Sequence, residues 1–128
     1  MQQHIDINQL IQLSPAKVFS LANNETISLN YFAYDSVEEV EQVIEMSKKS
    51  GIVHSTLKFL AKQCNIGYLI ALLNSYGEFK IENVMSNSQI YYIVIIKNGN
   101  EQNEVGEFTY TADELCAALW SAVSNHVL

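Results

Sequence analysis

The chain has 128 residues, of which 48% are hydrophobic and 16% charged, so it can bury one core of ordinary domain size and is too apolar for a disordered polymer. Seven lysines, no arginine and fourteen acidic residues give a formal net charge of −7. This balance argues against direct binding to nucleic acid or to an anionic membrane, since both call for a basic protein surface. We expect a single domain over residues 1–128.

The N-terminal part of the chain is predicted to be helical, with one strand. Asp6 can cap a first short helix, and Ser14 followed by Pro15 is typical of the start of a second helix. Alternating apolar and polar residues predict a strand over Thr26–Tyr34.

The next segment carries the clearest helix signals. A helix is predicted over Ser36–Lys49, because Ser36 and Glu39 have the spacing of a capping box and apolar residues recur on one side. Two further helices are expected, one over Ile52–Asn65 and one over residues 68–75.

The C-terminal part predicts an antiparallel meander and a closing helix. Three strands are expected, over Glu78–Met85, Ile90–Lys97 and Glu104–Tyr110. The middle strand is apolar on both faces, as is typical of a central strand. Thr111 and Glu114 have the spacing of a second capping box, for a helix that ends near His126. The predicted fold is α+β, a single layer of helices packed on a mainly antiparallel sheet.

The sequence holds no recognisable catalytic or metal-binding motif. The best candidates for an unrecognised site are His54, Cys64 and Cys116, but a ten-residue gap on one helix would hold His54 and Cys64 about 15 Å apart. We therefore predict a chain without enzymatic activity, metal or cofactor. The two cysteines are interpreted as reduced core thiols of a cytoplasmic protein, and a disulfide between them is the alternative.

Acidic residues form the most distinctive pattern. Glu38, Glu41 and Glu45 are spaced to share one stripe of the predicted helix, and no basic residue lies within helical reach of the first two. A second acidic group, which includes Glu104 and Glu107, surrounds the last predicted hairpin. An unneutralised stripe can contact a basic partner, and the alternative is a face that interacts only with solvent.

Tyrosine is the second contact-prone feature. Tyr91 and Tyr92 are adjacent in one predicted strand, so their side chains point to opposite faces and at least one is expected outside the core. The alternative is ordinary sheet packing, which also favours tyrosine. The predicted partner-binding residues are Glu38, Glu41, Glu45, Glu104, Glu107, Tyr91 and Tyr92.

These features favour a small acidic protein-binding module. The predicted partner is a protein with a basic surface, which this chain would occlude as a stoichiometric inhibitor or immunity-type protein, for example of a nuclease. An acidic secretion chaperone belongs to the same physical class. Two alternatives come from other classes. One is a small enzyme or ligand-binding domain, and the other is a structural subunit that self-associates, as in a homodimer, through Phe59 and the exposed side of the sheet.

Overall fold

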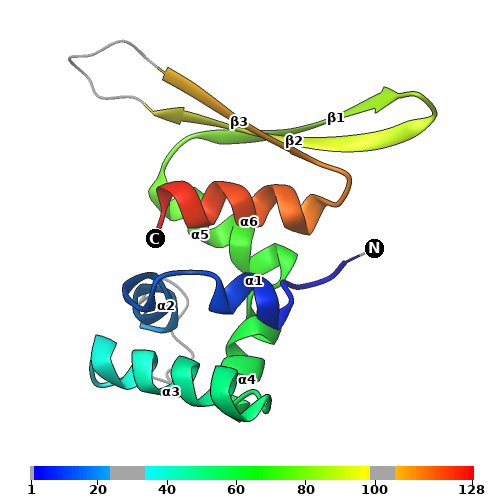
Figure 1. Ribbon diagram of the computed structural model, residues 1–128. Coiled ribbons are helices and arrows are strands. Elements are labelled where there is room, and N and C mark those ends of the chain that lie inside the picture. The colour runs from blue at the N-terminus through cyan, green and yellow to red at the C-terminus, as the bar shows by residue number, and fades with distance from the viewer. Residues whose placement is uncertain (1, 24–33, 99–105) are drawn as a thin grey trace.

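The computed structural model describes residues 2–23, 34–98 and 106–128, and these form six helices and three strands (Figure 1). The helices are α1 (Ile7–Ile11), α2 (Pro15–Ala22), α3 (Val37–Ser50), α4 (Ser55–Gln63), α5 (Ile66–Tyr76) and α6 (Leu115–His126). The strands are β1 (Phe79–Ser86), β2 (Gln89–Asn98) and β3 (Gly106–Ala112). The predicted α+β class is confirmed. The predicted strand over Thr26–Tyr34 lies, except for its last residue, outside the described residues.

The three strands form an antiparallel sheet in the order β1-β2-β3, so β2 is central as predicted. Val94 of β2 lies opposite Ile81 of β1 and Tyr110 of β3. The β1–β2 turn is formed by Asn87 and Ser88, which both have positive φ, 52° and 64°. This is the backbone of a type I′ hairpin, whose twist matches that of the flanking strands and fixes their register.

The helices lie on one side of the sheet. α6 packs directly against β2 and β3, and α5 packs beside α6 (Figure 1). The other four helices extend the helical body further from the sheet, where α2 packs on α3 and α1 on α4. Figure 1 places α3 at the end of the molecule away from the sheet. The two ends therefore present different surfaces.

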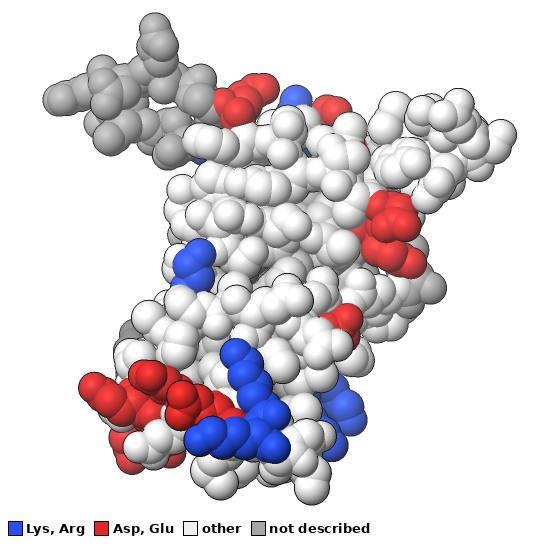
Figure 2. All heavy atoms as spheres, viewed as in Figure 1, with Lys and Arg blue, Asp and Glu red and all other residues white. Residues whose placement is uncertain are grey.

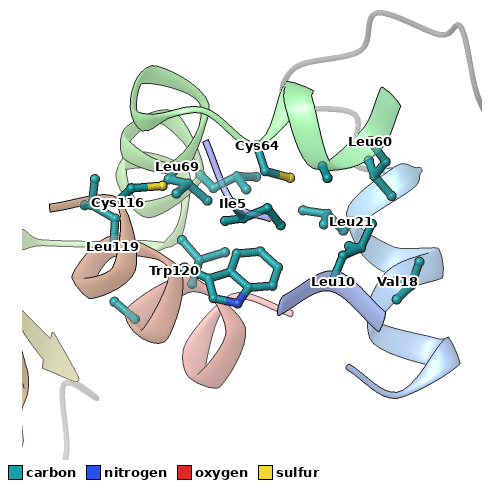
Figure 3. Packing of buried hydrophobic residues seen from close by; sticks show 14 of the residues in the cluster. Ile5, Leu10, Val18, Leu21, Leu60, Cys64, Leu69, Cys116, Leu119 and Trp120 are labelled. Carbon is teal, nitrogen blue, oxygen red and sulfur yellow. The ribbon is translucent and has the colours of Figure 1, made fainter. Parts of the chain in front are cut away.

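A continuous hydrophobic core joins these elements. Figure 3 shows Ile5, Leu10, Leu69 and Trp120 converging from the N-terminal segment, α1, α5 and α6, and all are buried. The Ile5 backbone N–H donates to the carbonyl of Cys64 at 3.1 Å, which ties the N-terminal segment to the junction of α4 and α5. The segment before α1 is therefore part of the core.

Two predicted helix starts differ from the structure. Thr111 and Glu114 do not form a capping box, because β3 continues through Ala112, which pairs with Tyr92 of β2. Helix α6 starts only after Glu114, which makes no side-chain cap bond. The Glu114 carboxylate instead accepts from the backbone N–H of Gln2 at 3.1 Å. A strand ladder has overridden a local helix signal.

The second difference is the helix predicted from Ile52. Gly51 adopts a left-handed backbone, with φ of 71°, and ends α3, after which the chain stays non-helical until His54 caps α4. Ile52 therefore lies in the connection and is 74% exposed. The predicted cap of α3 is half formed. The Ser36 hydroxyl accepts from the Glu39 N–H at 3.2 Å, but the Glu39 carboxylate accepts from the backbone N–H of Asp35 at 2.9 Å and not from that of Ser36.

Candidate functional site

The acidic row on α3, defined here as Glu38, Glu41 and Glu45, is exposed along its whole length. Val40 and Ile44 are buried and anchor the opposite side of α3 to the core. The helix is amphipathic, and burial of its apolar side turns the row outward. The two ion pairs found among the described residues join Lys80 to Glu82 and Lys97 to Glu78. Neither involves the row, whose carboxylates are left for solvent or a partner.

Lysines lie next to this row. Lys48 and Lys49 occupy the last turn of α3, where the helix dipole favours cations, and Lys58 and Lys62 are exposed on α4. Figure 2 shows the carboxylates gathered over α3 with lysine side chains beside them, at the end of the molecule away from the sheet. This end therefore carries both signs of charge in separate patches, a pattern that orients a charged partner as well as attracting it.

The other predicted partner-binding residues lie elsewhere. Glu107 is exposed on β3 opposite Lys97, and Glu104 lies outside the described residues. Tyr91 is half-buried on the sheet face away from α6, and its hydroxyl donates to the Gln89 side chain at 3.2 Å. Tyr92 packs against the core on the opposite face. The structure places the acidic row at one end of the molecule and the sheet residues at the other.

The candidate catalytic residues do not converge. Cys64 and Cys116 are free thiols in the core, and burial raises their pKa values to about 12 and about 11. Both thiols therefore stay protonated near neutral pH, whereas a reactive cysteine needs a thiolate. His54 is exposed at the start of α4, where its Nδ1 accepts from the Thr56 backbone N–H at 3.2 Å. This imidazole has a capping role.

An aromatic cluster surrounds His126 at the end of α6. Its ring centroid lies 4.7 Å from that of Phe108, 5.4 Å from that of Tyr110 and 6.1 Å from that of Tyr76. The Tyr110 hydroxyl and His126 Nε2 share a hydrogen bond. The cluster joins α5, β3 and α6, so it fixes the position of the sheet on the helices. Sequence reasoning missed it because its members come from distant segments.

The outer part of the β1–β2 hairpin, residues 81–90, is called the arm. Every residue of the arm is exposed, and Figure 1 shows it extending past the start of α6. Four large apolar side chains are exposed on it, those of Ile81, Val84, Met85 and Ile90. Met85 is 70% exposed. The sequence predicted a strand over Glu78–Met85 but did not show that its outer half extends past the helices.

The described surface has hollows, and two of them have volumes of several hundred Å³. The larger, about 510 Å³, lies between α4 and α5 and is open and mainly apolar, with Phe59, Lys62 and Tyr68 in its lining. The other, about 400 Å³, lies where Ile81 of the arm and Tyr92 approach Leu115 at the start of α6. Neither hollow is lined by a cysteine or a histidine. We therefore do not assign an active site to either.

Within the described residues, no group of three His, Cys, Asp or Glu side chains is placed to hold a metal ion. None of the helices in that part of the chain is both long and apolar enough to cross a membrane. No protein-family model, curated protein or solved structure matches this chain. Functional conclusions therefore depend on the geometry of the chain itself.

Proposed function

We propose that the chain is a protein-binding module that covers a basic surface of its partner with the acidic row of α3. The observation that supports this most directly is that Glu38, Glu41 and Glu45 are exposed on a rigidly anchored helix and form none of the described ion pairs. Holding three like charges on one stripe costs a few tenths of a kcal/mol per pair, which a basic partner offsets.

The proposed mode of action is occlusion of the partner, as in a stoichiometric inhibitor or immunity-type protein. A target that handles nucleic acid fits this chemistry, since it must expose a basic surface to bind phosphates. The neighbouring lysines, Lys48 and Lys49 on α3 and Lys58 on α4, favour a target whose basic patch is bordered by acidic residues. The buried, protonated thiols supply no competing catalytic centre.

The first test is capture of partners by the purified chain from cells that naturally contain it, at about 50 mM and about 500 mM salt. Screening lengths fall well below 10 Å in the higher salt, so a complex held by exposed charges should be released. A partner identified by mass spectrometry is then purified and titrated with the chain. The partner should be basic and bind at one-to-one stoichiometry.

The second test is charge reversal in the row. The variant E38K/E41K should weaken binding to the purified partner at least about tenfold and reduce its salt dependence. The matched control changes Asp113, an exposed acidic residue near the sheet, to lysine. Asp113→Lys is compared with the single variant Glu41→Lys, because the two variants carry the same net charge. If Glu41→Lys weakens binding no more than Asp113→Lys does, the acidic row is not the interface.

A further inference from the structure

Strand β1 is an edge of the sheet, and it carries three of the exposed apolar side chains, Ile81, Val84 and Met85. The sheet is held to the helices mainly through contacts of α6 with β2 and β3, so the outer part of β1 extends past the helical body (Figure 1). None of the described strands pairs with its open side. An eight-residue edge strand with exposed apolar side chains is a template for pairing with another chain unless a device blocks it.

The free main-chain groups of this edge can be assigned. The backbone N–H of Lys97 donates to the carbonyl of Glu78 at 3.2 Å, so even-numbered residues of β1 bond to β2. In an antiparallel pair the alternate residues direct their N–H and C=O groups to the other side. Phe79, Ile81 and Asn83 therefore offer both groups to the open edge, and neither proline nor glycine interrupts the strand.

We propose that β1 pairs antiparallel with β1 of a second copy of this chain, about a two-fold axis through Ile81. In this register Ile81 lies opposite Ile81 of the second copy, and the two residues exchange two main-chain hydrogen bonds. Asn83 of each copy lies opposite Phe79 of the other, which adds two further bonded pairs. The two sheets become one sheet of six strands, with α6 of both copies on the same side.

Charge favours this register over those shifted by one residue. With Ile81 on the axis, Lys80 of each copy lies opposite Glu82 of the other, so two cross-strand pairs of opposite charge form. The side chains of Lys80 and Glu82 already approach within 3.5 Å in one chain. The dimer would therefore contain a group of four neighbouring charges of alternating sign, two from each copy. Moving the axis to Lys80 or to Glu82 would place identical charges opposite each other, which is unfavourable.

Burial supports the same register. On the face toward the helices, the two Ile81 side chains meet at the axis, and Phe79 of one copy lies diagonally between Ile81 and Met85 of the other. Ile81 and Met85, two of the exposed apolar residues of the arm, thus gain contacts that the chain alone does not provide. The α3 end lies away from the sheet, so this dimer leaves the acidic row uncovered and does not depend on the proposed function.

The experiment measures the mass of the protein by sedimentation over a range of concentrations. We expect the mass to rise with concentration toward twice the 14.4 kDa of one chain. The variant Lys80→Glu turns both cross-strand pairs into repulsive ones and should weaken the dimer about tenfold. The double variant K80E/E82K restores opposite charges across the axis and should restore the dimer, which a general effect of charge would not do.

Cross-linking tests the axis itself. Bonded pairs of antiparallel strands hold their Cα atoms about 5.5 Å apart, within the range of a disulfide, so Ile81→Cys should form a covalent dimer on oxidation. Asn83→Cys on the same face is the control, because the two Asn83 residues would lie about 13 Å apart along the strands. The native Cys64 and Cys116 are buried, so the unaltered chain should not cross-link.

Circular dichroism of each variant should match that of the unaltered chain, since the substituted side chains are exposed and the Lys80–Glu82 ion pair lies on the surface, where such pairs add little stability. A mass of one chain at every concentration up to about 1 mM overturns the proposal. So does a dimer that ignores Lys80→Glu, or one in which Asn83→Cys cross-links and Ile81→Cys does not. A dimer that is broken only by E38K/E41K would place the contact on α3 and overturn it equally.

Discussion

Alkaline pH should destabilise this protein through its buried thiols, and Cys64 gives the cleanest measurement. Its side chain is fully buried, and burial raises its pKa from 9.0 to about 12. The folded state holds the proton up to about pH 12, whereas the unfolded state releases it above pH 9. Stability is therefore fully present below pH 9 and is lost as the pH rises toward 12, because the unfolded state binds fewer protons there.

The size of the effect follows from the two pKa values. Between pH 8 and pH 10 an unfolded thiol of pKa 9.0 changes from mostly protonated to mostly ionised, while the folded thiol stays neutral. Integration over this interval gives about 1.4 kcal/mol of lost stability from Cys64 alone. Cys116 adds a loss of the same sign, since burial raises its pKa to about 11.

The assay is urea unfolding of the unaltered chain and of Cys64→Ala at both pH values. The substitution costs stability at each pH because it removes packed atoms, but that cost does not depend on pH. The drop between pH 8 and pH 10 should therefore be about 1.4 kcal/mol smaller in Cys64→Ala. Equal drops in the two proteins would contradict this expectation. They would mean that the Cys64 thiol ionises as readily in the folded state as in the unfolded state, as expected of a reactive thiol.

Two further substitutions test how the helices begin and end. Asn65→Ala removes the side-chain oxygen that accepts from the Tyr68 N–H at 2.9 Å, so unfolding by urea should show a loss of about 1 kcal/mol. Gly51→Ala meets no atom within 4 Å but must adopt a φ of 71°, so the same assay should show a loss of about 1 kcal/mol. An unchanged midpoint in either variant would contradict the corresponding cap.

Local chemistry made much of the fold predictable. The caps of the first three helices depend on residues next to the helix start, and Asp6, Ser14 and Ser36 all accept the expected backbone N–H bonds. The central position of β2 agrees with the prediction made from its apolar residues on both faces. These features need no knowledge of distant parts of the chain.

Long-range contacts account for what the sequence did not show. Pairing of Ala112 with Tyr92 extends β3 and displaces the capping box predicted at Thr111. The sequence predicted a strand over Glu78–Met85, but a strand pattern carries no information about where the supporting helix stops, so the exposure of Ile81 and Met85 was not foreseen. The acidic row was predictable as a stripe, whereas its separation from the sheet required the three-dimensional arrangement.

The acidic row and the edge strand β1 lie at opposite ends of the folded molecule, so their effects can be measured separately. A dimer through β1 would carry two acidic rows, so a partner immobilised at high density should be held more tightly than one in solution, by effective concentration alone. Lys80→Glu should remove this gain and leave the affinity for a single dissolved partner unchanged. E38K/E41K should reduce that affinity and leave the dimer intact. If Lys80→Glu lowers the affinity for the dissolved partner, the sheet edge itself contacts the partner, and the two surfaces are one interface.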